Sequence, residues 1–153
     1  MADFVFNISK GKVNRYADLP DAADALLIVL LKLAGIEADA VLKDYATLAA
    51  ILGAANDEAD FTGYTRRTLA SVTVTPDNTN DWQSADAADP AAYTNSGGVP
   101  QAVAKAVLVW DGDTGAGTDT SIVPLVALDC AVTFDIGVAT TLGFNASGFF
   151  RAT

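Results

Sequence analysis

AKAVLVWDGDTGAGTDTSIVPLVALDCAVTFD, residues 104–135, is the stretch that decides the fold of this chain. Two apolar runs rich in Val, Leu and Ile flank a loop of Gly, Asp, Thr and Ser. β-Branched and aromatic side chains fit a pleated, half-buried surface, and the loop has turn chemistry. We therefore predict a long β-hairpin with strands over residues 105–111 and 122–134. Pro124 lacks a ladder donor, so its strand is expected to lie at an edge or to bulge there.

Such a hairpin is stable only when a second layer covers its apolar face, and the rest of the chain has to supply that layer. With 153 residues, 51% of them hydrophobic and 18% charged, the chain is long enough to bury one core. Neither half alone offers a complete two-sided core, so we predict a single domain over residues 1–153. The expected fold class is mainly β (α+β), an antiparallel β-sandwich-like domain.

Residues 25–33, ALLIVLLKL, are compatible with two structures. The run is short and apolar throughout, so periodicity does not separate a helix from a strand buried on both faces. Pro20 before the run and Gly35 after it would suit a helix. Both structures stay open, and the strand is slightly preferred because of the resemblance described below.

Residues 40–54 show the one clear helical period in the chain, and we predict a short amphipathic helix there. Asp39 or Asp44 would cap its start, and Gly53 lies near its end. The apolar positions that follow one helix face are Val41, Tyr45, Leu48 and Leu52.

The remaining chain alternates short strand patterns with turns. Phe4, Phe6 and Ile8 lie on one side of a period-two pattern, which predicts a short strand or a docking arm within residues 1–9. Lysines make residues 10–17 suitable for an exposed edge strand. Further strands are predicted over residues 64–69, 71–75 and 81–85, a loop over 87–100, and a closing strand pair over 138–144 and 148–151 around a turn at 145–147.

The charge of the chain argues against two classes of partner. Nine Lys and Arg against 19 Asp and Glu give a net charge of −10. A nucleic-acid binder needs a clustered basic face, and an anionic membrane surface would repel this chain. The longest apolar run is also far shorter than the ~20 residues of a membrane helix. We expect neither nucleic acid nor a membrane as a partner.

The charge is unevenly distributed along the sequence. Seven of the nine basic residues lie within residues 1–70, and the rest of the chain is strongly acidic. This polarity would steer like copies head to tail or attract a basic partner. The simpler interpretation is that the polar loops use Asp for turns.

Residues suited to catalysis are scarce. The chain contains no His, which removes the commonest general base and every Ser-His-Asp or Cys-His arrangement. It has no nucleophile elbow, phosphate-binding loop or dinucleotide fingerprint. Cys130 stands alone in an apolar strand and is expected to fill the core rather than react. We expect no enzyme activity and no cofactor.

One loop raises the question of a metal. Residues 111–119, DGDTGAGTD, place carboxylates at relative positions 1, 3 and 9, as an EF-hand loop does. The pattern then fails, because Gly115 stands at position 5, Ala116 replaces the required glycine and Ile122 replaces the last ligand. A wide hairpin turn is the favoured interpretation, and the weak metal candidates are Asp111, Asp113 and Asp119.

Several aromatic residues suggest an alternative function, a carbohydrate- or receptor-binding module with a surface aromatic platform. Trp110 ends an apolar strand and is expected in the core, whereas Trp82 and Tyr93 have polar surroundings and are the better surface candidates. The full set considered for the platform is Tyr64, Trp82, Tyr93 and Trp110.

The order and spacing of several segments resemble a family of small virion proteins from tailed bacteriophages, chiefly those that infect actinobacteria. The match spans nearly the whole chain, and no single motif is diagnostic. The segments that carry it are FNISKGKV at 6–13, the apolar run 25–33 followed by AGIEADA at 34–40, DYATLA at 44–49, NDEADFTGY at 56–64, DGDT at 111–114 with its GTD close, and GFFRA at 148–152.

This resemblance implies a non-enzymatic particle component with a β-rich fold, of a kind loosely labelled minor tail or head protein. It implies no catalytic residues. The expected partners are other virion proteins, such as the major capsid or tail proteins, and further copies in a symmetric oligomer. The expected location is the virion, after synthesis in the host cytoplasm, and capsid decoration and tail placement both stay open. The interface candidates are Phe4, Phe6 and Ile8 in the arm, and Phe149 and Phe150 near the C-terminus.

Overall fold

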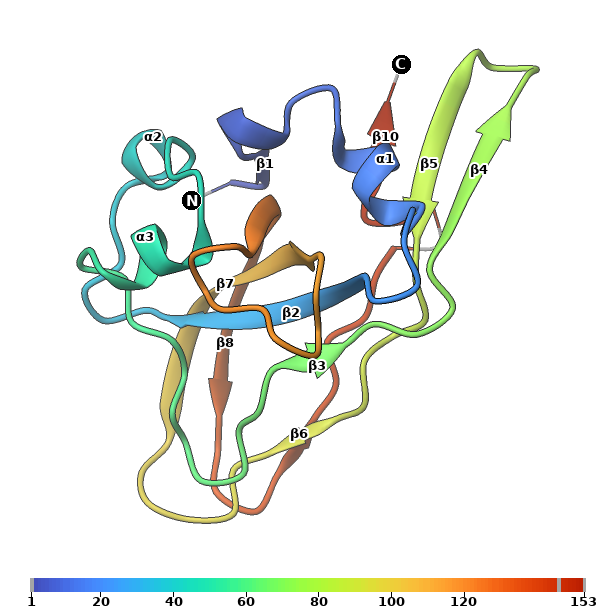
Figure 1. Ribbon diagram of the computed structural model, residues 1–153. Helices are drawn as coiled ribbons and strands as arrows, with labels where there is room; N and C mark the ends of the chain where they lie inside the picture. The colour runs from blue at the N-terminus through green and yellow to red at the C-terminus, as the bar shows by residue number, and fades with distance from the viewer. Residues whose placement is uncertain (1, 146, 153) are drawn as a thin grey trace.

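A long antiparallel hairpin forms the centre of the molecule (Figure 1). The computed structural model describes residues 2–145 and 147–152. Within them, the strand order of the main sheet is β1-β8-β7-β2-β3. Its strands are β1 (Phe4–Val5), β2 (Ala25–Lys32), β3 (Arg67–Thr68), β7 (Gln101–Asp111) and β8 (Val123–Phe134).

The predicted hairpin is confirmed as β7 and β8, and β7 begins earlier than predicted, at Gln101. The irregularity predicted at Pro124 is also confirmed. The register between the two strands shifts between Leu108 and Val109, and Val109 lies opposite Pro124. A residue without an N–H is tolerated where the ladder is already irregular.

Strand β2 settles the ambiguous run over residues 25–33. It lies between β7 and β3, and its alternate side chains enter two different cores. Leu26 and Ile28 belong to the larger core on one face, and Val29 and Leu31 to the smaller core on the other. Because both faces of the strand are covered, its sequence is apolar throughout.

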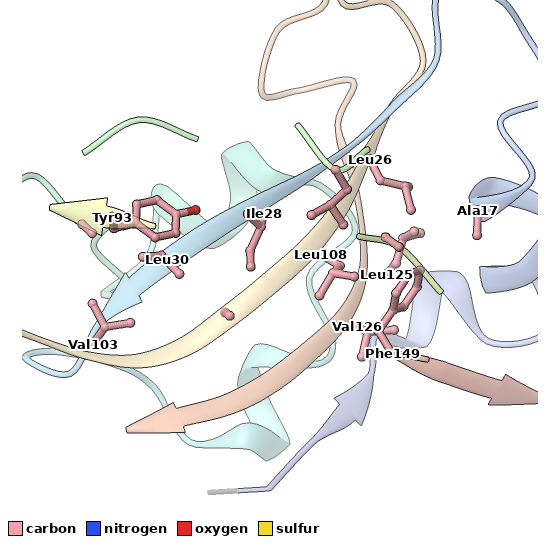
Figure 2. Packing of buried hydrophobic residues seen from close by; sticks show 14 of the residues in the cluster. Ala17, Leu26, Ile28, Leu30, Tyr93, Val103, Leu108, Leu125, Val126 and Phe149 are labelled. Atoms are coloured by element: carbon pink, nitrogen blue, oxygen red, sulfur yellow. The ribbon is translucent and has the colours of Figure 1, made fainter. Parts of the chain in front are cut away.

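The larger core brings together residues from many segments (Figure 2). In this close-up, the β2 side chains lie beside Leu108 from β7 and Val126 from β8. Ala17, Tyr93 and Phe149 enter the same cluster from segments far away in the sequence. The main sheet therefore depends on cover from nearly the whole length of the chain.

The smaller core is covered by two short helices, α2 (Asp39–Leu42) and α3 (Leu48–Leu52). The single helix predicted over residues 40–54 is therefore wrong. The amide of Leu48 donates to Ile122 O at 3.0 Å, and that of Ala49 to Asp119 O at 2.8 Å. Because these two amides bond to the β7–β8 connection, they do not continue the hydrogen-bond ladder of α2.

The ends of α3 are defined by its own residues. Thr47 is extended and its side chain accepts a hydrogen bond from the Ala50 amide, so Thr47 is the N-cap, in place of the predicted Asp39 or Asp44. Gly53 ends the helix, as predicted. Val41, predicted on the apolar face, is 47% exposed, because α2 is a separate turn with its own orientation.

A three-stranded and a two-stranded sheet accompany the main sheet. The strands predicted over residues 71–75 and 81–85 are confirmed as a pair, and each begins and ends one or two residues later than predicted. The strands of these sheets are β4 (Thr73–Asp77), β5 (Trp82–Asp86) and β10 (Phe150–Ala152) in the first, and β6 (Tyr93–Thr94) and β9 (Ala139–Thr140) in the second.

The predicted closing strand pair is wrong. β9 pairs with β6, and β10 pairs with β5. The amide of Phe149 donates to Ala85 O at 3.0 Å and its ring is buried in the larger core, so the C-terminal strand is anchored on β5. Residue 146, at the centre of the predicted turn, lies outside the described residues.

Three further predictions are corrected by the structure. Residues 10–17 contain a helix, α1 (Val13–Ala17), because Val13 and Ala17 are four residues apart and both are buried. The strand predicted over residues 64–69 is reduced to β3, and the loop predicted over 87–100 contains β6. The fold as a whole is mainly β, antiparallel and sandwich-like with short helices, as predicted.

Candidate functional site

Residues 2–9, here called the arm, lie against β8 and α2. Strand β1 pairs antiparallel with β8, with Val5 opposite Val126. The predicted period-two strand ends at Val5, and the 3₁₀ helix η1 (Asn7–Ser9) follows. The arm therefore changes direction at Phe6, which donates its amide to Leu125 O at 3.0 Å.

The side chains of the arm divide between the core and the surface. Phe6 is 0% exposed in the smaller core, whereas Ile8 is 40% exposed. Ser9 is buried, and its hydroxyl donates to Pro124 O at 2.7 Å. The Asn7 amide donates to Lys43 O at 2.9 Å. The arm is thus fixed at both ends of η1.

The most unusual polar contact of the arm is with Lys105, which is 0% exposed in the middle of β7. Its ammonium donates to the carbonyl of Ala2 at 2.6 Å. The carboxylates of Asp39 and Asp129 lie 3.3 Å and 3.6 Å from the same nitrogen. The Phe4 ring covers this nitrogen, with its centroid 5.2 Å away. We call this group of side chains the Lys105 centre.

The Lys105 centre also binds the backbone of the arm. The Ala2 amide donates to Asp39 Oδ2 at 2.8 Å, and the Asp129 amide donates to the Asp3 carboxylate at 2.6 Å. Burial raises the pKa of the Asp39 carboxyl, but the Ala2 hydrogen bond and the Lys105 ammonium outweigh it, and the pKa lies below its ordinary value. The Asp39 carboxylate is therefore a stable acceptor for the arm.

The desolvation energy of the buried Lys105 ammonium explains why the Lys105 centre binds the arm. A buried ammonium costs several kcal/mol of desolvation, which only well-placed acceptors offset. Among the described residues, the Ala2 carbonyl is the closest acceptor to the Lys105 ammonium, at 2.6 Å, and the carboxylates of Asp39 and Asp129 follow at 3.3 Å and 3.6 Å. The arrangement holds an extended peptide segment, the arm, through its backbone and its side chains.

The five interface candidates differ in how far their side chains are exposed. Phe6 and Phe149 are buried in the chain's own cores, Phe4 and Phe150 are half-buried, and Ile8 is exposed. Phe149 and Phe150 line a groove of about 440 Å³ beside the Lys105 centre, together with Asp3, Asp129 and Arg151. A role between molecules stays a prediction for all five.

A second ionic group, the Arg66 centre, ties three loops together. Arg66 donates to Glu58 at 2.9 Å and 2.6 Å and to Asp119 Oδ2 at 2.9 Å. The Tyr64 hydroxyl donates to Glu58 at 2.8 Å and accepts the Leu30 amide at 3.1 Å. The hydrogen bonds from Arg66 hold the pKa of the Asp119 carboxyl below its ordinary value.

The three weak metal candidates do not converge. Asp119 is engaged by Arg66, while Asp111 accepts the Asp113 amide at 3.1 Å and Asp113 accepts the Gly115 amide at 3.1 Å. Within the part of the chain that the structure describes, Cys, Asp and Glu residues form no group of three or more that would hold a metal ion. These carboxylates shape the hairpin turn.

The predicted aromatic platform does not form either. Tyr93 is 0% exposed, so its prediction as a surface residue is wrong. It stacks with Tyr64 at a centroid distance of 6.0 Å and meets Phe61 and Phe134 edge-on. The polar residues around Tyr93 in the sequence conceal this cluster, because its other rings come from two distant segments, residues 61–64 and Phe134.

The two tryptophans lie in separate places. Trp110 is half-buried, borders the larger core and packs against Tyr16 at 4.6 Å between ring centroids. Trp82 is also half-buried, and the Arg151 guanidinium lies 4.1 Å from its ring centroid. No surface therefore unites the four residues considered for the platform.

Cys130 is half-buried in β8 and packs against the larger core. Burial and the neighbouring Asp129 raise the pKa of its thiol to about 12. A thiol with so high a pKa is protonated at neutral pH, which makes it a poor nucleophile.

Sequence reasoning missed both ionic centres. A lone charge within the apolar run 103–109 marked Lys105 as unusual, because an unpaired Lys is almost never fully buried. No local signal pointed to its partners, which come from the arm, α2 and β8. Arg66 carried no signal beyond its charge.

The comparisons with known proteins add no relative. Among the described residues, no helix has the length and apolarity that crossing a membrane requires. No family model, no curated protein and no solved structure matches the chain.

Proposed function

We propose that this protein is a non-enzymatic structural component of a tailed-bacteriophage virion, assembled on the particle as a capsid decoration or minor tail protein. The observation that carries the proposal is the arm, which contacts distant parts of the chain, among them a buried lysine. A short terminal segment recognised in this way is a typical docking device of assemblies. The resemblance of the sequence to small virion proteins supports the same function.

The partners proposed are the major capsid or tail proteins and further copies of the chain. A net charge of −10 keeps single copies apart in solution, so a specific contact is needed to bring them together. The groove of about 440 Å³ beside Phe149 and Phe150 is the surface offered to a particle protein.

The proposal is tested by counting copies in purified particles of the phage that encodes the chain. Quantitative mass spectrometry with isotope-labelled peptides is expected to give a fixed number per particle, in the hundreds for capsid decoration or in the tens for a tail component. The matched control is a non-structural protein of the same phage. Particles that contain the chain only at the level of this control would contradict the proposal.

A second candidate function, carbohydrate binding, is favoured by one observation. Tyr16 and Trp110 pack together beside Lys12 and Arg15 around a cavity of about 350 Å³. An aromatic pair next to two cations suits an acidic sugar. A glycan array with the intact protein tests this function, and binding that disappears in Arg15→Glu would support it.

A further inference from the structure

Apart from a local turn bond, in which the Lys12 amide donates to Ser9 O at 2.9 Å, the arm is held by residues that lie far from it in the sequence. Its contacts reach Asp39 and Lys43 near α2, Lys105 in β7, and β8. We call the surface that receives it the seat: Asp39, Lys43, Lys105, Asp129 and residues 124–127 of β8. None of these contacts depends on which chain supplies the arm.

The connection behind the arm is suited to act as a hinge. Lys10 and Lys12 are exposed, and Gly11 between them has φ +72°, with nothing within 4 Å of the position a Cβ would take. After the hinge, α1 packs mainly on β4, β5 and β10. The covalent connection between the arm and the body that begins at Val13 is therefore a short exposed segment.

The seat is unfavourable without an arm. Removing the arm would take the closest acceptor from the Lys105 ammonium, the Ala2 carbonyl at 2.6 Å, and would empty the part of the smaller core that Phe6 fills. Every copy therefore requires an arm in its seat. The contacts are the same whether the arm comes from the same copy or from a neighbour. The local concentration of neighbouring copies therefore decides which arm is bound.

We propose that the arm exchanges between copies, so that residues 2–9 of one copy fill the seat of its neighbour and link the assembled proteins. The partner is a second copy of this chain. The proposal rests on the proposed function for one reason only, because a particle holds copies close together and raises their effective concentration.

A disulfide between arm and seat tests the exchange in the full-length chain. Val5 lies directly opposite Val126 in the β1–β8 ladder, at a spacing that an engineered disulfide bridges. The variant combines Val5→Cys and Val126→Cys with Cys130→Ser, which removes the native thiol. Mild oxidation traps each arm in its seat, and non-reducing electrophoresis with intact mass separates internal bonds from bonds between chains.

Two preparations are oxidised in parallel, purified particles and the isolated protein over a hundredfold range of concentration. We expect covalent multimers as the main product from particles, and in solution covalent dimers whose fraction rises with concentration. If the protein in particles is recovered as internally bonded monomers, the exchange is overturned. If particles do not contain the protein, internally bonded monomers in the most concentrated solution overturn it. Absence from particles alone contradicts the proposed function and leaves the solution measurement to decide the exchange.

Two control variants complete the experiment. Val5→Cys with Cys130→Ser lacks the partner thiol and is expected to give no arm-to-seat bond. Thr75→Cys with Ser84→Cys, in the same Cys130→Ser background, joins directly opposite residues of β4 and β5. That hairpin lies within one chain, so it is expected to give internal bonds at every concentration.

Discussion

The Lys105 centre and the Arg66 centre join distant segments by different physical means. Lys105 is a point charge without solvent contact, and its closest partner is a backbone carbonyl. Arg66 keeps 27% of its side chain exposed and binds two carboxylates through several of its nitrogens. The comparison shows that burial decides how much each cation depends on its partners. Without its acceptors the buried lysine would lose all solvation, whereas water would still solvate part of the arginine.

The largest effect is expected for Lys105→Met, which keeps the volume and removes the charge. The two carboxylates lose their cation, and the Ala2 carbonyl loses its donor. We expect a loss of about 3 kcal/mol in the free energy of unfolding, because both carboxylates are partly exposed and regain some hydration. Urea unfolding measures it, and a loss below about 1 kcal/mol would show that the arm does not depend on Lys105.

A smaller loss is expected for Arg66→Met. Glu58 and Asp119 lose their shared donor but remain partly exposed to water. We expect about 2 kcal/mol in the same urea experiment, in line with hydrogen bonds to charged groups. Arg66→Lys is the matched variant and should recover only part of the loss, since Lys does not span both carboxylates. Equal stability of both variants would contradict the bidentate role.

Acid pH is expected to reduce the difference in the free energy of unfolding between the wild type and Arg66→Met. Arg66 lowers the pKa of Asp119 in the folded state, so this stabilisation is present above the unfolded pKa, near 3.8, and disappears as the pH falls through the folded pKa. Unfolding midpoints from pH 7 down to pH 2 measure the gap. A gap that stays constant over this range would mean that Arg66 acts through packing rather than charge.

The smallest effect is expected for Asp60→Asn. Asp60 pairs with Lys32 at 2.8 Å, but its side chain is 70% exposed. Exposed ion pairs contribute about 0–1 kcal/mol, so the midpoint should hardly move. A loss as large as that of Arg66→Met would show that exposure does not rank the ionic contacts of this protein.

The elements predicted correctly are those whose signal is local. The hairpin followed from two apolar runs around a loop of turn residues, and Pro124 marked its own irregularity. Residues 25–33 stayed ambiguous because an apolar run carries no period, and the cover on both faces of β2 comes from elsewhere in the chain.

The errors arose where distant segments decide the local structure. The interruption between α2 and α3 depends on the carbonyls of Asp119 and Ile122, which no helical period reveals. Tyr93 packs against rings from two distant segments and is buried despite its polar neighbours. Residues 10–17 were predicted as an edge strand because of their lysines, but the segment contains α1, whose Val13 and Ala17 are buried against distant parts of the chain.

The candidate site was predicted only in part. The arm was located from the alternation of Phe4, Phe6 and Ile8, but only Phe4 lies in β1. The seat could not be predicted, because Lys105, Asp39 and Asp129 come together only in the folded chain.

The position of Cys130 gives the protein a built-in reporter. Its thiol is the only one in the sequence, lies in β8 next to Asp129, and has a pKa of about 12. In the folded protein the Cys130 thiol is expected to react slowly with disulfide reagents, because almost no thiolate is present at neutral pH. When β8 opens locally around Cys130, the thiol regains solvent and an ordinary pKa. The rate at which unmodified protein is labelled therefore records how often β8 opens beside the seat.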